Sequence, residues 1–163
     1  MKKIFLILII IITLTGCTLG NTPTAKVEDL LTKYQMLDND IEVDYTTLIG
    51  DISLNEEQIK TYNNIIKKQY KNLTYEVKEE EIDGNNAIVT IQIEVKNYKN
   101  TINKYNKQDY ETTKYHELVT KSLDTTKEMI TYTLDITLTK DNNDIWILDP
   151  LTEENKDKLI GIY

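Results

Sequence analysis

The strongest constraint on the fold is an alternation of apolar and polar residues in two stretches, 87–95 and 130–138. Successive side chains of a β-strand point to opposite faces, so each stretch predicts a strand with one apolar and one polar face. Such strands are typical of an antiparallel sheet that is packed on one side and solvated on the other. The residues expected to face the core are Ala87, Val89, Ile91, Ile93, Val95, Ile130, Tyr132, Leu134, Ile136 and Leu138.

Two further stretches extend this to a sheet of about four strands. Leu73, Tyr75 and Val77 alternate with polar residues, and Asp83-Gly84 after them predicts a hairpin turn, because both residue types tolerate positive φ. Residues 145–148 are apolar at every position, so we expect this strand to be covered on both faces.

Helix signals lie before the sheet and between its strands. Thr22-Pro23 predicts an N-cap and first turn, and Ser53-x-x-Glu56 matches a capping box that begins a second, amphipathic helix. Residues 41–52 and 110–128 also have helical spacing, although β-branched residues and a glycine interrupt the first of these.

A short final helix is predicted between Thr152, as its cap, and Gly161, as its end. Residues 97–109 are polar and fit no regular pattern. The whole predicts one α+β domain over residues 23–163: a curved antiparallel sheet with the N-terminal helices packed on one face.

The N-terminus has the layout of an export signal. Lys2 and Lys3 precede an aliphatic run over residues 4–14, small residues follow, and then comes the single cysteine of the chain, Cys17. Spanning a bilayer as a helix takes about 20 apolar residues, and this run is much shorter. A removable signal is therefore a better interpretation than a transmembrane helix.

Leu14-Thr15-Gly16-Cys17 resembles the bacterial lipobox. The resemblance implies cleavage between Gly16 and Cys17 and a thioether-linked diacylglyceryl group, with acyl chains such as palmitate, on Cys17. It gives a signal peptide over residues 1–16, a lipidated tether over 17–22, and anchoring to the bilayer at the outer face of the cell membrane. Two acyl chains suffice for stable attachment, whereas one gives only marginal binding.

The charge balance argues against nucleic acid as a partner. The formal net charge of −8 becomes −10 when residues 1–16 and their two lysines are removed, and an acidic domain is repelled by phosphate backbones. All basic residues other than the single histidine are lysines, so the bidentate clamp that arginine forms on phosphate is not available.

The polar side of the sheet is the best candidate for a ligand face. Paired carboxylates there could perform acid–base chemistry if a pocket of low polarity raised one pKa, but solvent exposure is the simpler expectation. Whether the polar faces of the two long strands share one surface is left open. The candidate residues are Gln92, Glu94, Thr133, Asp135 and Thr137.

One stretch is locally basic and could contact an anionic cell-wall polymer or a protein, since lysine attracts negative charge and tyrosine stacks on sugars. A solvated loop is the more ordinary interpretation. Its residues are Lys96, Tyr98, Lys99, Lys104, Tyr105 and Lys107.

The remaining polar features have simple structural interpretations. His116, the only histidine, has no cysteine or nucleophile partner in the pattern, so we expect a surface or boundary residue. Residues 79–81, three glutamates, should guard a sheet edge, and residues 141–144 form a turn rather than a calcium loop. No cofactor or metal is expected.

The order of elements, together with the terminal strand Asp144-Ile145-Trp146-Ile147-Leu148-Asp149, resembles small export lipoproteins with a nuclear transport factor 2-like or cystatin-like fold. This resemblance implies a curved sheet that wraps helices and can enclose a pocket. Two functions follow as alternatives. The first is a non-catalytic module that binds a partner through the sheet or the basic stretch. The second is a pocketed small-ligand carrier or isomerase-type enzyme that uses Glu94 or Asp135. The oligomeric state is not indicated.

Overall fold

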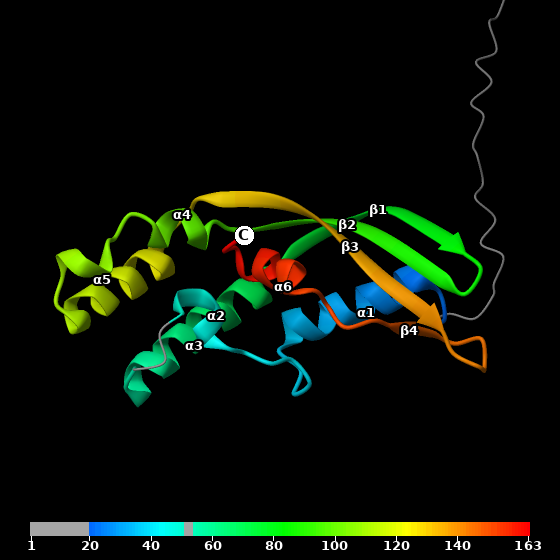
Figure 1. The fold of residues 1–163 in the computed structure, drawn as a ribbon, viewed down its shortest axis with the longest axis horizontal. Coiled ribbons are helices and arrows are strands. Elements are labelled where there is room, and N and C mark those ends of the chain that lie inside the picture. Colours follow the sequence, from blue (N-terminus) through cyan, green and yellow to red (C-terminus); the bar gives the residue numbers. More distant parts are fainter. Residues whose placement is uncertain (1–19, 51–53) are drawn as a thin grey trace, which may run out of the picture.

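The sheet has four antiparallel strands in the order β1-β2-β3-β4, and helices lie against one of its faces (Figure 1). The structure, a computed structural model, describes residues 20–50 and 54–163. The strands are β1 (Thr74–Asp83), β2 (Asn86–Lys96), β3 (Met129–Lys140) and β4 (Trp146–Leu148). The α+β class and the number of strands are as the sequence predicts.

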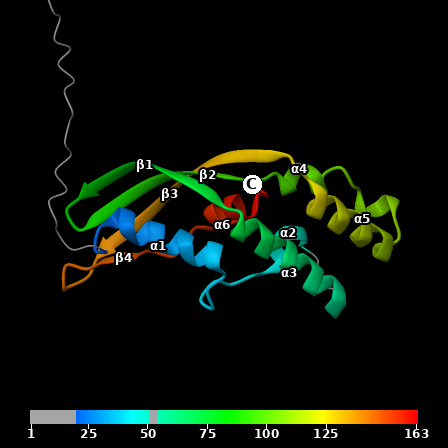
Figure 2. The same cartoon turned by 180° about the vertical axis from the view of Figure 1, so that it is seen from behind.

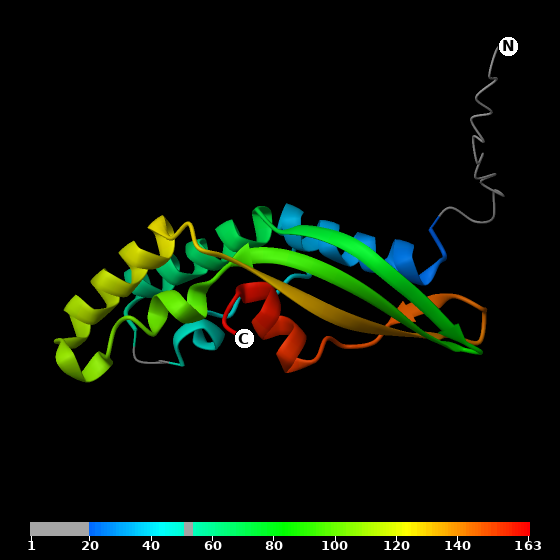
Figure 3. The same cartoon turned by 90° about the horizontal axis from the view of Figure 1, so that it is seen from above.

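The helices divide into three groups along the chain. The first three are α1 (Pro23–Met36), α2 (Tyr45–Ile49) and α3 (Glu56–Lys71); α4 (Tyr98–Ile102), the 3₁₀ turn η1 (Lys107–Asp109) and α5 (Thr112–Thr125) connect β2 to β3; and α6 (Glu153–Ile160) ends the chain. Helices α1, α3 and α6 pack under the curved sheet, whereas α5 lies beyond its end, alongside α3 (Figures 2 and 3).

The alternation predicts the two faces of the long strands correctly. In the β2–β3 register, Val89 lies opposite Ile136 and Ile91 opposite Leu134, and all four are buried. Together with Val27 and Leu31 of α1 and Ile66 of α3, they form one core. Each large side chain buried in this way contributes on the order of 1.5–3 kcal/mol.

The cap signals predict the bounds of α1 and α6 correctly and the start of α3 only in part. The Oγ1 of Thr22 accepts a hydrogen bond from Ala25 N at 3.1 Å, and Thr152 and Gly161 bound α6 as expected. The capping box of α3 is Asn55 with Gln58, so the predicted box at Ser53-x-x-Glu56 is wrong in its Glu56 member. Ser53 itself lies outside the described residues.

One predicted helix is shorter than expected. The helical pattern over 41–52 yields only α2 within its described part, because Gly50 takes a left-handed conformation with φ of 62° and ends it, while residues 51–52 lie outside the described residues. The Asp83-Gly84 hairpin is present, with Gly84 and Asn85 as the two turn residues and positive φ at Gly84 alone. The unassigned stretch 97–109 forms α4 and η1.

We expected residues 145–148 to form a strand that is covered on both faces. This prediction is wrong, because β4 is an edge strand. Ile145 and Ile147 are 42% and 52% exposed, and only Trp146 is buried. Ile147 pairs with Thr139, whose side chain lies on the open face of the sheet, so an apolar run here does not indicate burial on both sides.

Beyond its short pairing with β4, the free edge of β3 is covered by α6 and the segment before it. Asp149 N donates to Thr137 O, the Asn155 side chain to Asp135 O at 2.9 Å, and Lys158 Nζ to Thr133 O at 3.0 Å. These bonds satisfy backbone carbonyls that an edge strand would otherwise present to other chains.

The first described residues are hydrogen-bonded to one end of the sheet, the end that lies away from α5. The Asn21 side chain donates to Asp144 O at 3.1 Å and accepts from Trp146 N at 3.0 Å, in the manner of an added strand residue. The start of the domain is therefore held at the β3–β4 turn.

Candidate functional site

The predicted ligand face is a single surface, but it is open. Gln92 lies opposite Thr133, and Asp135 lies opposite Thr90, whose hydroxyl donates to the Asp135 carboxylate at 2.7 Å. Glu94, Thr133, Asp135 and Thr137 are exposed, and Gln92 is half-buried. Gln92 and Glu94 border only a shallow hollow at the β1–β2 pairing. Asp135 does not line this hollow, and the enzyme alternative, which uses Glu94 or Asp135, stays a prediction.

The basic stretch is less accessible than predicted. Tyr98 is 1% exposed and packs in the core, where burial raises the pKa of its hydroxyl. Tyr105 is half-buried with its hydroxyl 2.5 Å from Ser122 Oγ, and Lys96 is half-buried as well. The exposed members are Lys99, Lys104 and Lys107. Tyr98 is buried because it lies on α4, which packs against α5, and its hydroxyl donates to Ile65 O of α3 at 3.4 Å.

The prediction that His116 is a surface or boundary residue is wrong. Its side chain is 1% exposed, and its Nδ1 lies 2.9 Å from the hydroxyl of Tyr62 on α3. The sequence did carry a signal, because His116 is three residues before Val119 and thus on the buried face of α5. The histidine therefore lies between α3 and α5.

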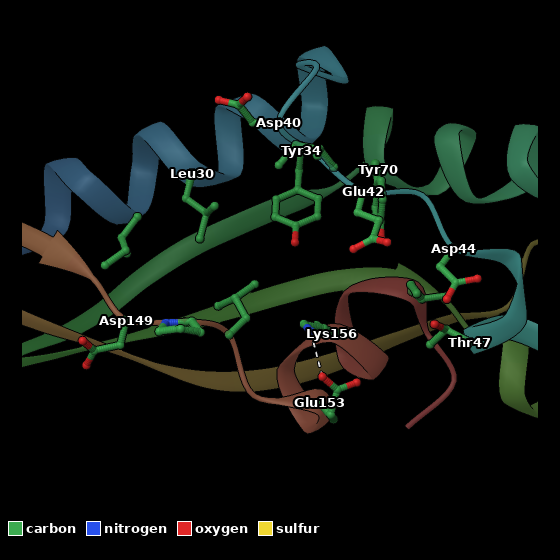
Figure 4. A pocket seen from close by; sticks show the side chains of 15 residues that line it. Leu30, Tyr34, Asp40, Glu42, Asp44, Thr47, Tyr70, Asp149, Glu153 and Lys156 are labelled. Atoms are coloured by element: carbon green, nitrogen blue, oxygen red, sulfur yellow. Dashed lines mark hydrogen bonds and ion pairs between the residues drawn. The ribbon is translucent and has the colours of Figure 1, made fainter.

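A cleft of about 370 Å³ lies on the helix side of the molecule (Figure 4). It lies between α1, the α1–α2 segment, α3, and the chain from β4 into α6. Its lining is Leu30, Tyr34, Asp40, Ile41, Glu42, Asp44, Thr47, Tyr70, Leu148, Asp149, Pro150, Leu151, Glu153, Lys156 and Ile160.

Tyr34 of α1 and Tyr70 of α3 form one wall of this cleft. Their ring centroids are 4.8 Å apart at an interplanar angle of 79°, an edge-to-face contact, and both side chains extend from their helices toward α6 (Figure 4). Tyr70 is only 4% exposed, and burial raises its pKa, with smaller contributions from Tyr34 and Asp44. Burial also raises the pKa of Tyr34. Both hydroxyls therefore stay protonated at neutral pH.

Within the described part of the chain, neither tyrosine hydroxyl has a hydrogen-bond partner. The Tyr70 side chain is buried, and it lines the open cleft, where its hydroxyl can bond to water or to a ligand. The hydroxyl is thus available to a group that the cleft receives from outside.

The rim of the cleft is acidic. The Asp44 carboxylate caps α2 by accepting from Thr46, Asp149 accepts from Thr139, and Glu153 pairs with Lys156 at 2.7 Å. Asp40 and Glu42 have no hydrogen bond or ion pair from their carboxylates to any described residue.

Sequence reasoning missed this site because its parts are far apart along the chain. The acidic segment after α1 was interpreted only as the end of a helix. It becomes a rim when α1 and α3 bring it opposite residues 148–156. The one local signal was the density of aspartate and glutamate over residues 38–44.

The acidic residues are spread around the rim rather than gathered at a point. Among residues 20–50 and 54–163, no group of three or more histidine, cysteine, aspartate or glutamate side chains could hold a metal ion.

Comparison with known proteins bears on the N-terminus alone. Residues 1–18 match the family model of the prokaryotic membrane lipoprotein lipid attachment site. The match supports a lipid-anchored lipoprotein, as the lipobox predicts. No curated protein and no solved structure matches the chain, so the nuclear transport factor 2-like or cystatin-like resemblance stays a prediction. In the described ranges, none of the helices is long and apolar enough to cross a bilayer.

Proposed function

We propose that this chain is a lipid-anchored, non-catalytic binding module at the outer face of the cell membrane, and that it takes a small ligand in the helix-side cleft. The observation that carries the proposal is Tyr70, whose side chain is almost fully buried, lines the cleft, and has a hydroxyl without a partner among the described residues. A cleft of a few hundred Å³ that combines apolar walls with a few polar groups is typical of a ligand site.

The placement of the titratable groups favours binding over catalysis. His116 is enclosed between α3 and α5 and does not line the cleft. Glu94 and Asp135, the carboxylates of the isomerase alternative, are exposed on the opposite face of the sheet and do not line the cleft. The cleft instead offers acceptors and protonated hydroxyls that can hold a ligand.

The anchor would hold the domain close to the bilayer. Cys17 precedes Asn21 by four residues, which span at most about 14 Å, and Asn21 is bonded to the β3–β4 turn. A lipid on Cys17 therefore places the hairpin end of the sheet within that distance of the membrane surface.

A thermal-shift screen tests the proposal. The full lipoprotein, purified with its lipid in non-ionic detergent, is heated in the presence of a panel of small metabolites. A ligand at a hundred times its Kd stabilises the folded state by about 2.7 kcal/mol, which is a readily measured shift in Tm.

Two tryptophan variants make this screen specific. Leu30→Trp would fill the cleft and should abolish the shift, whereas Thr137→Trp, on the open face, should leave it unchanged. A panel without hits, or hits that survive Leu30→Trp, would refute the cleft as the binding site.

A further inference from the structure

We propose that the ligand of this cleft is a small organic cation, an alkylammonium with a short aliphatic body. The inference rests on the proposed function and specifies its ligand class. It is argued from the charge, hydrogen-bonding capacity, shape and apolar surface of the cleft.

The charge of the lining is strongly negative. Five carboxylates, Asp40, Glu42, Asp44, Asp149 and Glu153, face one ammonium, that of Lys156. That ammonium is already bonded to Glu153 at 2.7 Å, and Glu153 holds the pKa of Lys156 above its usual range. The cleft thus attracts a cation and disfavours an anion.

The hydrogen-bonding capacity also fits a donor. An ammonium group has only donors, and ionised carboxylates have only acceptors. Asp40 and Glu42 have no bond from their carboxylates to other described residues, and the hydroxyls of Tyr34 and Tyr70 can accept as well as donate. A bound ammonium could donate to any of these four groups.

The apolar part of the lining specifies a body for this cation. Leu30, Ile41, Leu148, Leu151 and Ile160 lie among the charged residues, and the two tyrosine rings stand edge to face beside them. Aromatic rings attract organic cations, and aliphatic side chains bury methylene groups. A bare metal ion would use none of this surface, and the carboxylates do not converge on a point that could hold one.

The test is calorimetric titration of the full lipoprotein in non-ionic detergent with n-butylammonium chloride, against butan-1-ol as the uncharged probe of the same length. Titration into protein-free micelles corrects for partitioning. We expect saturable binding of n-butylammonium and at least about tenfold weaker binding of butan-1-ol, because charge-assisted bonds are roughly twice as strong as neutral ones.

Two variants with the same change of charge locate the binding. Glu42→Gln removes an exposed carboxylate at the rim and should weaken binding by about fivefold or more, while Glu79→Gln, on β1 outside the cleft, should leave the affinity unchanged. Tyr70→Phe removes only the hydroxyl and should also weaken binding.

Three outcomes would overturn the inference: no saturable binding, equal affinity for butan-1-ol, or equal losses in Glu42→Gln and Glu79→Gln. If n-butylammonium fails while another ligand of the panel stabilises the protein and is lost in Leu30→Trp, the cation class is wrong and the binding function stands. If neither n-butylammonium nor any ligand of the panel binds in the cleft, both proposals fail.

Discussion

The hydroxyl of Tyr62 and the Nδ1 of His116 lie 2.9 Å apart in the interior, with their rings edge to face at 5.9 Å between centroids. This contact joins α3, which packs under the sheet, to α5, which extends past it. A polar group buried at a helix–helix contact stabilises the fold only while it is hydrogen-bonded.

Tyr62→Phe should therefore destabilise the protein by about 1–3 kcal/mol, the cost of a buried polar group that loses its partner. Urea unfolding followed by circular dichroism measures this. Tyr110→Phe, at a tyrosine that is 40% exposed, is the matched control and should stay within about 0.5 kcal/mol of the wild type. Equal stability of all three proteins would contradict the assigned role.

The sequence predicted those features that depend on local pattern. The alternation in residues 87–95 and 130–138 gave the two long strands and their buried faces, and Thr22 and Thr152 marked the starts of α1 and α6. Such features follow from the two-residue period of a strand and the unsatisfied amides of a helix, which neighbouring residues reveal.

What could not be predicted depends on contacts between distant segments. The pattern does not predict burial of His116 and Tyr98, because it comes from packing of α5 on α3 and of α4 on α5. Ile147 looked like a core residue, and only the strand order places it at an edge. The cleft combines residues 30–47, 70 and 148–160, and no local pattern connects these ranges.

Gly161 should tolerate alanine far less than Gly50. Both have positive φ, 87° and 62°, which alone costs an alanine about 1–2 kcal/mol. A Cβ on Gly161 would also lie 2.1 Å from Lys96 O, whereas a Cβ on Gly50 would meet nothing within 4 Å. We expect Gly161→Ala to lose about 2–5 kcal/mol, strain and overpacking together, and Gly50→Ala no more than about 2. Chemical denaturation of the two variants compares them, and similar losses would argue against the close approach.

Asn21→Ala should release the start of the domain from the β3–β4 turn. The Trp146 amide, which donates to Asn21 Oδ1, then loses its acceptor and should exchange with solvent faster. The Ile145 amide, which donates to Asp141 Oδ1 at 2.9 Å, provides the internal reference and should keep its rate. Hydrogen exchange measured by mass spectrometry or NMR separates the two amides, and unchanged exchange at Trp146 would refute the contact.

The stability of the protein should fall in alkaline solution through Tyr70. Burial raises the pKa of this tyrosine above its ordinary value of 10.0, so the folded state binds the phenolic proton more tightly than the unfolded chain does. The resulting stabilisation is complete below pH 10 and is lost as the pH rises from there toward the folded-state pKa.

Tyr70→Phe should therefore shift the midpoint of alkaline unfolding upward and remove one late-ionising phenol from the tyrosinate absorbance. Tyr110→Phe, at an exposed tyrosine, is the control. It should change the midpoint of alkaline unfolding and the late part of the tyrosinate absorbance less than Tyr70→Phe does. A Tyr70 that ionises with the exposed tyrosines would show that the side chain is solvated.

Cys17→Ser should abolish lipid attachment, because the thioether requires the thiol sulfur and this is the only cysteine of the chain. Metabolic labelling with a palmitate analogue, followed by detergent-phase partitioning, measures it. We expect label and detergent-phase partitioning in the wild type and neither in the variant. Label that persists in Cys17→Ser would contradict the lipobox prediction.

The covering of β3 by α6 has a consequence for the order in which the domain can be completed. The groups that bind Thr133 O, Asp135 O and Thr137 O come from residues 149–158, near the very end of the chain. In a polypeptide that emerges N-terminus first, the residues of the long β2–β3 ladder emerge before these residues do. During that interval one side of β3 is an unpaired, adhesive edge, which invites pairing with a second nascent chain. Helix α6 thus closes the sheet late in assembly, and we expect its loss to uncover β3, to remove Leu159 and Ile160 from the core, and to cause aggregation.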